Sequence, residues 1–315
     1  MGSRATPALR GDGSAPADGR RAPPRATTSV AGVIGDPVRH SLSPVLHNAA
    51  FAALGLDWVY VAFPVPAGRG RAAVAAVRDL GIAGLSVTMP HKASAAQAVD
   101  RLSPVAGRLR AVNTVIRDGD DLVGDSTDGP GLLDALRADH RWDPARLRCL
   151  VLGTGGAARS VILALADAGA AEVAVAGRRP DAVGEAVALA GTVGRAATVD
   201  GADRFDLVVN ATPVGMPAEA VVPLREPPDG DGGGFELPFG LDPSRLGAGQ
   251  LVVDLIYRPP VTPLLAAARA GGATAVNGLG MLIHQAGRQV SAWTGLDAPL
   301  DAMSAAVLGA IAHDH

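Results

Sequence analysis

The chain has 315 residues, 48% of them apolar, and a formal net charge of -3. This length is typical of about two domains, and the apolar content is sufficient to bury a core in each. Acidic and basic residues are interspersed, which argues against a nucleic-acid-binding surface or a basic face for an anionic membrane. The composition therefore favours a globular protein whose partner is a small molecule.

A single cysteine, Cys149, limits the chemistry that the chain can support. One cysteine cannot form an intrachain disulfide, and no Cys and His residues have the spacing of structural metal sites. We therefore expect a reducing, cytoplasmic location and no metal ion.

The first 27 residues are rich in Ala, Pro, Gly and Arg. They contain too few large apolar side chains to order themselves, so we predict a disordered tail. A targeting segment is the alternative, but the stretch contains Asp12 and Asp18 and has no apolar centre. Further along, the most apolar stretch, 161–177, contains Asp167 and Glu172, which argues against a membrane span.

Short β-rich runs and Ala-rich runs of helical period alternate along most of the chain. In chain order, the sequence predicts strands and helices in turn at 30–35, 44–54, 57–63, 71–80 and 84–88. After residue 130 it predicts strands at 149–153, 172–177, 206–210 and 251–257, with helices at 157–168, after Pro180 and from Pro263. This alternation is typical of α/β domains with mostly parallel sheets, and we predict that the second half is doubly wound.

Two segments interrupt this alternation. Residues 123–131, VGDSTDGPG, are rich in turn-forming residues and are predicted to be a hinge or the wall of a cleft. Residues 217–249 are rich in Pro and Gly and too long for an ordinary connection, so we predict a surface loop that is mobile in part.

A glycine motif, GTGGAA at 153–158, follows the apolar run CLVL and opens a predicted helix. In dinucleotide-binding proteins such glycines make a tight turn and let the backbone approach a pyrophosphate at the helix N-terminus. We predict that Gly153, Gly155, Gly156 and Ala157 bind a dinucleotide cofactor. A purely structural turn is the alternative.

Two arginines, Arg178 and Arg179, follow the next predicted strand. An NAD-binding site carries an acidic residue at this place, against the ribose 2′-hydroxyl. A guanidinium group suits a 2′-phosphate instead, because its fork of donors matches phosphate geometry. The pair therefore predicts NADP as the cofactor, with two solvated surface residues as the alternative.

Lys92 is the only lysine among 28 basic residues. A chain that otherwise uses arginine has a reason to keep a lysine where a proton must be exchanged, because arginine stays protonated. A lone lysine on a solvated face is the alternative.

Lys92 lies in GLSVTMPHK, residues 84–92, and this segment resembles the shikimate dehydrogenase family. Further segments resemble the same family in order and spacing: GDPVRHSLSP at 35–44, AVNT at 111–114, GDSTDGPG at 124–131, NATPVGM at 210–216, DLIYRPPVTPLL at 254–265 and GLGMLIHQA at 278–286. The resemblance implies reversible, NADPH-dependent reduction of 3-dehydroshikimate to shikimate, a step of aromatic amino-acid biosynthesis through chorismate.

The same resemblance implies an α/β fold of two domains with the active site in the cleft between them. A discontinuous substrate-binding domain is expected at 28–127 and 278–315, and a Rossmann-like NADP-binding domain at 128–277. The oligomeric state is left open, with a homodimer as one candidate.

The catalytic pair implied by the resemblance is Lys92 and Asp128. The Lys92 ammonium passes a proton to or from the oxygen at the reacting carbon while a hydride moves to or from the nicotinamide, and Asp128 orients Lys92. Turns favour Asp as well, so a structural role for Asp128 is open.

On the substrate side, Ser41 and Ser43 match the hydroxyls that bind the substrate carboxylate. Ser43 precedes Pro44, so a helix N-cap is the alternative for Ser43. Side chains that both donate and accept hydrogen bonds match the contacts to the ring hydroxyls: Thr88, Asn113 and Gln285.

Four further residues match family positions on the substrate or cofactor side. Tyr257 matches a substrate-side residue at a strand end, with core packing as the alternative. Thr212, Gly278 and Met281 match residues beside the cofactor, and Met281 is alternatively a core residue.

Three positions depart from the common family pattern. Ser86 and Ser126 stand where Asn is common, and Gly177 replaces the usual Asn before Arg178. At the first two positions, which lie on the substrate side, a hydroxyl in place of an amide removes one donor and one acceptor arm. We count Ser86 among the substrate-binding residues, and a preference for quinate or for an amino analogue of shikimate is the nearest alternative.

Two alternatives come from other classes of protein. One is a non-catalytic, NADP-responsive regulator on the same fold, against which the presence of Lys92, Asp128 and Gln285 argues. The other is a folate-linked or amino-acid dehydrogenase, which would share the glycine motif but has no reason to contain both SLSP and STDG.

Overall fold

A computed structural model describes residues 23–216 and 237–313 and divides the chain into two compact units. Unit 1 contains the residues up to Thr127 and those from Ile283 onward, and unit 2 contains Asp128–Leu282. The sequence suggested boundaries at 127/128 and 277/278. In the structure the second boundary falls inside one continuous helix, α9 (Leu279–Thr294).

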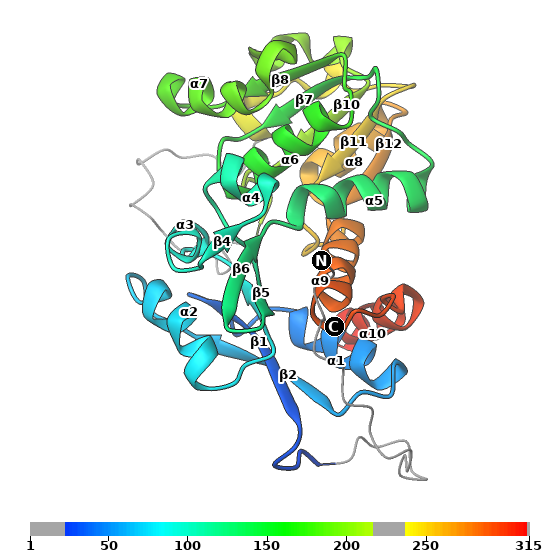
Figure 1. Ribbon diagram of the computed structural model, residues 1–315. Coiled ribbons are helices and arrows are strands. Elements are labelled where there is room, and N and C mark those ends of the chain that lie inside the picture. Colours follow the sequence, from blue (N-terminus) through cyan, green and yellow to red (C-terminus); the bar gives the residue numbers. More distant parts are fainter. Residues whose placement is uncertain (1–22, 217–236, 314–315) are drawn as a thin grey trace. The chain divides into compact units, whose positions relative to one another are not determined.

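Unit 1 is built on a six-stranded sheet in the order β2-β1-β3-β5-β6-β4 (Figure 1). Its strands are β1 (Ser29–Gly35), β2 (Trp58–Pro64), β3 (Gly84–Val87), β4 (Arg101–Leu102), β5 (Thr114–Asp118) and β6 (Asp121–Asp125). Strand β5 runs antiparallel to both β3 and β6, and the other pairs are parallel. The sheet is therefore mixed, and the β5–β6 hairpin, which turns at Gly119 with φ of +65°, was not among the predicted elements.

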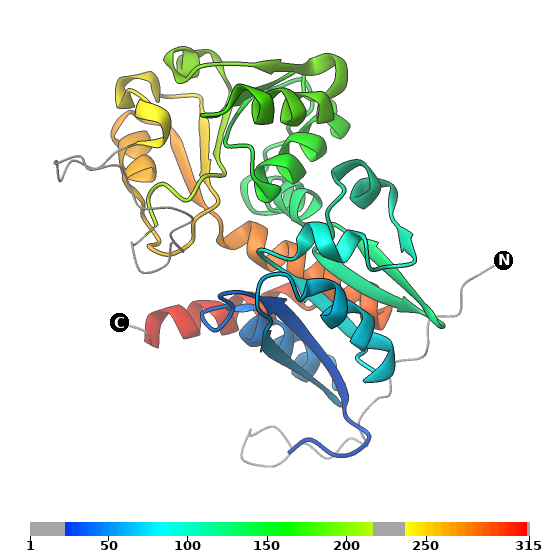
Figure 2. The same cartoon turned by 90° about the vertical axis from the view of Figure 1, so that its left-hand side faces the viewer.

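Helices cover both faces of the unit 1 sheet. One face packs against α2 (Gly70–Asp79), α3 (Lys92–Ala96) and α4 (Pro104–Leu109), through a core that includes Leu85. The neighbouring Gly84 faces the opposite side, where an added Cβ would lie 2.4 Å from the Trp293 ring of α9. On that side α1 (Ser43–Ala53) lies beside α10 (Leu300–His313), seen as the blue and red helices of Figure 2.

Unit 2 is a six-stranded parallel sheet in the order β12-β11-β10-β7-β8-β9. Its strands are β7 (Arg148–Leu152), β8 (Glu172–Ala176), β9 (Gly194–Ala196), β10 (Leu207–Asn210), β11 (Leu251–Asp254) and β12 (Thr274–Asn277). Counted from β7 as the first strand, this is the Rossmann order, and the order reverses between β7 and β10. The prediction of an α/β protein with a Rossmann-like unit is confirmed.

Alternate residues of the unit 2 strands form two apolar layers. Cys149 and Val151 of β7 face α5 (Asp128–His140), α6 (Gly156–Asp167) and α7 (Pro180–Leu189), whereas Leu150 and Leu152 face α8 (Pro263–Ala270). Burial raises the pKa of the Cys149 thiol to about 12, so the thiol stays protonated at neutral pH. The cysteine is therefore a core residue.

The predicted disordered tail is too long at its C-terminal end. Thr28 donates its N–H to Arg25 O at 3.1 Å and its hydroxyl to Asp57 Oδ1 at 2.7 Å, so residues 25–28 form an ordered turn. The part of the predicted tail up to residue 22 lies outside the described residues.

Most of the segment 123–131, predicted to be turn-rich, is regular structure. Residues 123–125 complete β6 and Asp128 is the first residue of α5, so only Ser126 and Thr127 connect the two elements. The composition misled about turns because Gly and Pro are tolerated in the first turn of a helix, where the backbone N–H groups have no helical partner. The hinge or cleft wall stays a prediction.

From residue 237 onward, the predicted surface loop 217–249 is anchored to the core. Residues 217–236 lie outside the described residues, but 237–249 form the short turns η4 (Pro238–Gly240) and η5 (Pro243–Arg245). Leu241 and Leu246 are both 2% exposed and pack into the α8 side of the unit 2 core. Burial of these two leucines therefore fixes the segment to the core of unit 2, although its Pro- and Gly-rich composition suggests a loop.

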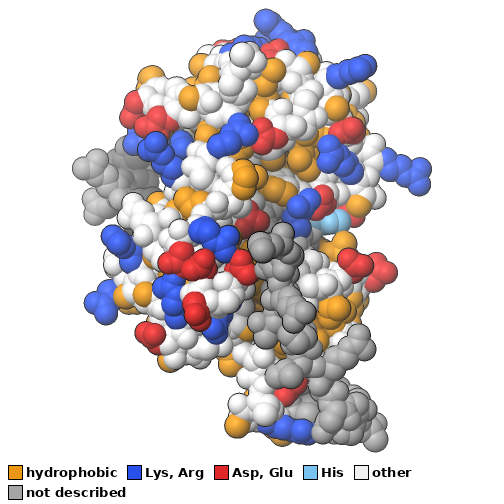
Figure 3. Space-filling model, viewed as in Figure 1, with side chains coloured by type: hydrophobic (Ala, Val, Ile, Leu, Met, Phe, Trp, Pro, Cys, Tyr) orange, Lys and Arg blue, Asp and Glu red, His pale blue; other side chains and the backbone are white. Residues whose placement is uncertain are grey.

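Charged side chains of both signs are interspersed on the face of the molecule shown in Figure 3. Within the described residues, no helix is long and apolar enough to cross a membrane. The same residues contain no group of three His, Cys, Asp or Glu side chains that could hold a metal ion.

Candidate functional site

The predicted substrate residues of unit 1 gather where neighbouring strands end. Ser41 and Ser43 follow β1, and Thr88 and Lys92 follow β3, which is the strand adjacent to β1. Asn113 comes immediately before β5, which is antiparallel to β3, so it lies at the same edge of the sheet. The strand order reverses between β1 and β3, and such switch points are where ligands bind in open α/β sheets.

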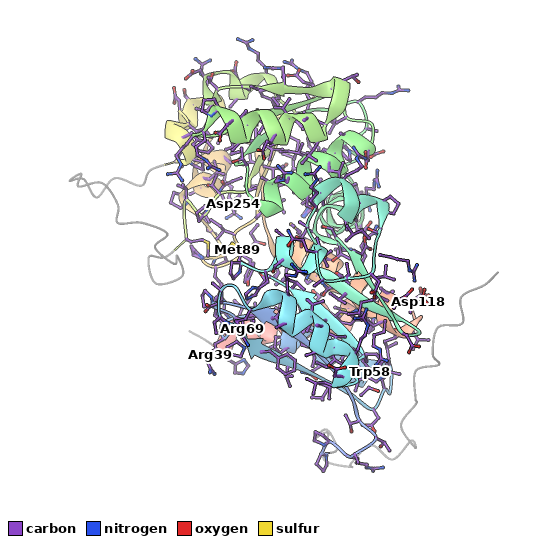
Figure 4. The ribbon with its side chains drawn as sticks, turned by 60° about the vertical axis from the view of Figure 1, so that its left-hand side comes forward. Arg39, Trp58, Arg69, Met89, Asp118 and Asp254 are labelled. Atoms are coloured by element: carbon purple, nitrogen blue, oxygen red, sulfur yellow. The ribbon has the colours of Figure 1, made fainter. Side chains whose placement is uncertain are left out.

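Figure 4 shows this edge of unit 1 through labelled side chains. Arg39, Arg69 and Met89, from the loops after β1, β2 and β3, lie along one side of the unit. Trp58, at the start of β2, and Asp118, at the end of β5, lie on the other side. The loops after β1 and β3 are joined by main-chain bonds, such as the one from the Asp36 N–H to Met89 O at 2.9 Å.

The two serines after β1 are placed by the start of α1. Helix α1 begins at Ser43 with Pro44 in its first turn and Leu42 as its N-cap, so the alternative that Ser43 is the N-cap is wrong. Ser41 Oγ accepts the Ser43 N–H at 3.2 Å, which gives Ser41 a local role in starting the helix. Both hydroxyls are thus held next to the end of β1.

His47, one turn after Ser43 in α1, is fully buried. Its Nδ1–H donates to Ser43 O at 2.8 Å, and its ring stacks on Tyr60 with centroids 4.1 Å apart. Burial lowers the pKa of His47 to about 4, so the ring is neutral at neutral pH. Its Nε2 has no hydrogen-bond partner among the described residues.

Lys92 is the first residue of α3 and is partly buried. Its main-chain oxygen accepts the Val112 N–H at 2.9 Å, which ties the start of α3 to the segment before β5. The preceding residue, His91, is 1% exposed, and its Nε2 lies 2.7 Å from Val65 O in the loop after β2. The lysine is therefore placed by contacts to two neighbouring segments.

The carboxamides of Asn113 and Gln285 are brought together by Thr127. Asn113 Nδ2 donates to Thr127 Oγ1 at 3.0 Å, and Thr127 Oγ1 donates to Gln285 Oε1 at 3.4 Å. All three residues are at least nine-tenths buried. The structure thus joins two of the predicted ring-hydroxyl contacts, which are far apart in the sequence.

Ser86 and Ser126 are both buried. Ser86 Oγ accepts a hydrogen bond from the Tyr60 hydroxyl at 2.7 Å and donates one to Gln289 Oε1 at 2.8 Å. The Ser126 N–H donates to Asp125 Oδ1 at 2.8 Å. Neither Gln289 nor Tyr60 was singled out from the sequence, although Gln289 follows Gln285 at the spacing that shares a helix face.

Asp128 belongs to unit 2, where it opens α5 and is 9% exposed. A carboxylate in the first turn of a helix interacts favourably with the helix dipole. The next residue, Gly129, donates its N–H to Ser160 Oγ at 2.8 Å, so this end of α5 packs closely on α6. The pairing of Asp128 with Lys92 stays a prediction.

The glycine motif of unit 2 lies at the switch point between β7 and β10. Gly153 has φ of +118°, and a Cβ there would lie 3.0 Å from Ala211 O, in the segment after β10. Gly155 is the N-cap of α6, and a Cβ there would meet no atom within 4 Å. Gly153 is therefore needed by the fold, whereas nothing in the fold alone requires Gly155.

Arg178 and Arg179 follow β8, beside β7, and both are exposed. Within the described residues neither guanidinium group forms a salt bridge. A Cβ on Gly177 would lie 2.8 Å from Val183 Cγ2 and 2.9 Å from Thr154 Cγ2. A side chain at position 177 would therefore require Val183 or Thr154 to shift.

A buried carboxylate organises the segment after β10. Asp254 accepts hydrogen bonds from the Thr262 hydroxyl at 2.6 Å and from Asn210 Nδ2 at 3.0 Å. Asn210 Oδ1 in turn accepts the Thr212 hydroxyl at 2.7 Å. Burial raises the pKa of Asp254, while these hydrogen bonds oppose the rise. Thr212 is thus held from within unit 2.

The remaining predicted residues have structural roles that the fold explains. A Cβ on Gly278 would lie 2.0 Å from Leu255 O, so only glycine fits. Met281 is partly buried and packs on the α6 side of the unit 2 core. Tyr257 is partly buried, and burial raises the pKa of its hydroxyl. Their contacts to ligands stay predictions.

The strand order of unit 2, with glycines at its switch point and arginines after the next strand, is that of a dinucleotide-binding α/β unit. The model of the shikimate dehydrogenase substrate binding domain matches residues 33–115. The model of the shikimate 5′-dehydrogenase C-terminal domain matches residues 278–308.

Known proteins narrow the class further. The shikimate dehydrogenase (NADP(+)) of Citrifermentans bemidjiense is 45% identical over 89% of this chain and 94% of its own length. The structure of the Thermus thermophilus shikimate 5-dehydrogenase with NADP(H) and shikimate is 35% identical, covers 88% of this chain and 98% of that one, and has a TM-score of 0.76. The quinate dehydrogenase of Corynebacterium glutamicum, in complex with NAD, is 28% identical over 90% of this chain and 99% of that one, with a TM-score of 0.76. The chain belongs to the shikimate dehydrogenase family, as its motifs predicted.

Proposed function

We propose that the chain catalyses the reversible, NADP-dependent oxidation of shikimate to 3-dehydroshikimate. The observation that carries the proposal is the edge of unit 1, where the only lysine of the chain follows the switch-point strand β3 and neutral hydrogen-bonding side chains surround the same strand ends. Family membership supports the same reaction, because curated relatives are NADP-dependent shikimate dehydrogenases.

The residues of unit 2 fit NADP. The open space at the Gly155 Cβ position allows a pyrophosphate to approach the N-terminus of α6, and the exposed Arg178 and Arg179 suit a 2′-phosphate. We propose that Gly153, Gly156, Ala157, Thr212, Gly278 and Met281 complete the cofactor site. When bound, the cofactor supplies a nicotinamide that exchanges a hydride with the substrate carbon.

On the substrate side, Ser41 and Ser43 bind the carboxylate, while Thr88, Asn113 and Gln285 bind the ring hydroxyls, with Tyr257 a further contact. During oxidation the carbinol C–H bond breaks with loss of a hydride, and the hydroxyl proton passes to Lys92 Nζ. Asp128 carries the negative charge that orients the lysine. In the reverse direction Lys92 returns the proton to the carbonyl oxygen.

Quinate is the second candidate substrate. Ser86 departs from the common family residue on the substrate side, and a quinate dehydrogenase is among the solved structures that this chain resembles. An amino analogue of shikimate is the third ligand to test. The regulator and the folate-linked or amino-acid dehydrogenase are not supported by the relatives, which are shikimate dehydrogenases over about nine-tenths of the chain.

The cellular setting belongs to the same proposal. A single, buried cysteine suits the reducing cytoplasm, where the reduced dinucleotide is available. A homodimer is one candidate state. Light scattering during gel filtration of the full chain separates a monomer from a dimer.

The test is the reduction of NADP+ and of NAD+ with shikimate, quinate and an amino analogue, followed by the absorbance of the reduced nicotinamide. We expect fast turnover with shikimate and NADP+. Faster turnover with quinate would identify quinate as the substrate, with the same hydride and proton transfer. Binding of NADPH without turnover of any ligand would support the regulator and overturn the proposal.

A further inference from the structure

A chain of hydrogen bonds links three strands and a helix inside unit 1. The Tyr60 hydroxyl of β2 donates to Ser86 Oγ of β3 at 2.7 Å, and Ser86 Oγ donates to Gln289 Oε1 of α9 at 2.8 Å. Gln289 Nε2 then donates to Thr114 Oγ1 of β5 at 3.0 Å. None of these four residues is more than 6% exposed, so bulk water cannot replace the partners.

The same chain continues to the residues that the proposed function assigns to the ring hydroxyls. Thr114 Oγ1 donates to Asn113 Oδ1 at 2.7 Å, and Asn113 Nδ2 donates to Thr127 Oγ1 at 3.0 Å. Thr127 Oγ1 donates to Gln285 Oε1 at 3.4 Å. An uninterrupted path of neutral groups therefore joins Tyr60 to both ligand-side carboxamides.

Two main-chain groups determine the orientation of the Gln289 and Asn113 carboxamides in this path. Gln289 Nε2 lies 3.4 Å from Asn113 O, a carbonyl that only accepts, so this end of the Gln289 carboxamide must be the NH2 group. The Thr127 N–H, which only donates, lies 2.8 Å from Asn113 Oδ1. With these two ends assigned, the hydroxyls of Tyr60 and Ser86 have one direction each, and the nearest acceptor for the Thr114 hydroxyl is Asn113 Oδ1 at 2.7 Å. The Thr127 hydroxyl has two carboxamide acceptors, Asn113 Oδ1 at 3.3 Å and Gln285 Oε1 at 3.4 Å.

Gln289 is itself held in a defined place on α9. It lies four residues after Gln285 and four before Trp293, so all three share one face of the helix. The Trp293 indole N–H donates to Val115 O at 3.0 Å, which anchors this face against β5. This anchor fixes α9 against β5, and it therefore also fixes the place of the Gln289 carboxamide.

We propose that Gln289 is a positioning residue for substrate recognition: through Thr114 it sets the orientation of the Asn113 carboxamide, and through Asn113 and Thr127 that of Gln285. In this way it determines which pattern of ring hydroxyls the site accepts. Ser86 acts through Gln289, because its only hydrogen is given to Gln289 Oε1. The inference rests on the proposed function, in which Asn113 and Gln285 contact the ligand.

The proposal also accounts for the departure at position 86. This chain has a hydroxyl at position 86 on β3 and a carboxamide opposite it, Gln289 on α9. The carboxamide at this place therefore comes from Gln289 of α9 and not from a residue of β3. This exchange predicts that Ser86→Asn restores what Gln289→Ala removes.

The experiment measures kcat and KM for shikimate, quinate and NADP+ in four forms of the full chain: wild type, Gln289→Ala, Ser86→Asn with Gln289→Ala, and the control Gln250→Ala. For Gln289→Ala we expect kcat/KM for shikimate to fall about tenfold, mainly through KM, with the preference over quinate reduced by a similar factor. KM for NADP+ should stay at the wild-type value. The double variant should regain most of the lost kcat/KM.

Gln250 is the matched control because it is a buried carboxamide of unit 2, 7% exposed, that donates to Ala202 O and Phe205 O at 2.8 Å each. Gln250→Ala should lower the melting temperature at least as much as Gln289→Ala, without changing the ratio of shikimate to quinate. A ratio in Gln289→Ala within twofold of wild type would overturn the proposal. So would an equal change of the ratio in both variants.

A measurement without turnover separates this inference from the proposed function. The side-chain amide of Asn113 is assigned in a 1H–15N spectrum by its loss in Asn113→Ala, and its exchange with water is compared in wild type and Gln289→Ala. Faster exchange in Gln289→Ala is expected whether or not the chain oxidises shikimate. Unchanged exchange would remove Gln289 as the residue that positions Asn113, even if the wild-type chain is fully active.

Discussion

The two units place different chemistry at the edges where their parallel strands end. Unit 1 presents buried Ser, Thr, Asn and Gln side chains that hydrogen-bond to one another, whereas unit 2 presents glycine backbone and two exposed arginines. A small polyol must be recognised by the direction of its hydroxyls, which neutral donors and acceptors read. A dinucleotide phosphate is recognised by backbone N–H groups and charge.

The two units also differ in how far the effect of one substitution extends to other residues of the site. In unit 1 the polar side chains form one continuous path of hydrogen bonds. Substituting one of them therefore changes the orientation of the others, and the effects of two substitutions on activity are not additive. In unit 2, Gly155 and Arg178 have no such connection to one another among the described contacts, so their effects should be nearly additive.

The largest effect is expected at Lys92. Lys92→Ala should lower kcat about a thousandfold with little change in NADPH affinity, because the positioned group that exchanges a proton with the substrate oxygen is lost. Lys92→Arg keeps the positive charge but cannot release a proton, so it should be impaired almost as much. Steady-state rates and NADPH titration by fluorescence measure both. An arginine variant with near wild-type kcat would assign Lys92 a purely electrostatic role.

The next effect concerns acid stability and comes from His47. Its pKa is lowered from 6.5 to about 4 in the folded state, so protonation favours unfolding. This contribution is fully present above pH 6.5 and is lost as the pH falls from about 6.5 to 4, a change of about 3 kcal/mol. Urea unfolding followed by tryptophan fluorescence detects it, because Trp58 and Trp293 lie in unit 1.

The control for this prediction is a pair of variants. His47→Leu should flatten the pH dependence between these values, although it also changes the stability at neutral pH. His40→Gln, which removes an imidazole at an exposed position, is the control measured beside it. An unchanged slope in His47→Leu would mean that the acid sensitivity of unit 1 has another source.

A smaller effect is expected at Arg178. Arg178→Ala should weaken NADPH binding by about 10- to 100-fold and leave NADH binding nearly unchanged, because a charge-assisted contact to the 2′-phosphate is lost. Arg195→Ala is the control: Arg195 is an exposed arginine of the same unit that pairs with Glu172 and lies 5.5 Å from the Phe205 ring centroid. Equal losses for NADH and NADPH in Arg178→Ala would indicate support of the fold instead.

The smallest effect contrasts two glycines of one motif. Gly155→Ala should leave the melting temperature unchanged, since no atom lies within 4 Å of its Cβ position, yet weaken NADPH binding about tenfold. Gly153→Ala should instead destabilise the free protein, because its φ of +118° is strained for alanine. Thermal unfolding with and without NADPH distinguishes the two. An NADPH affinity in Gly155→Ala equal to that of the wild type would show that the pyrophosphate does not bind at this turn.

Much of the fold could be predicted because hydrophobic periodicity reports local structure. The Rossmann unit followed from strands and helices in regular alternation, and the glycine motif marked its switch point. The β5–β6 hairpin was missed although its two loop residues, Gly119 and Asp120, are a typical turn signal. Leu241 and Leu246 were missed because the Pro- and Gly-rich composition around them predicts a loop, whereas both belong to the core.

The site was predictable only where a residue type carries its own chemical signal. Lys92 was singled out by its rarity and the arginines by their place after a strand, but Gln289 and Tyr60 have no such mark. Their importance depends on distances across β2, β3 and α9, which no local pattern encodes. A polar residue repeated at helical spacing, as in Gln285 and Gln289, is the one available hint.

Oxidation of shikimate by this chain with NADP+ can be tested in a single comparison of rates. The purified full chain is given shikimate with NADP+ or with NAD+, and formation of the reduced cofactor is followed in wild type and Lys92→Ala. The account predicts rapid turnover with NADP+, much slower turnover with NAD+, and a loss of about a thousandfold in the variant. Turnover of shikimate that is absent in the wild type, or equal in both proteins, would contradict it.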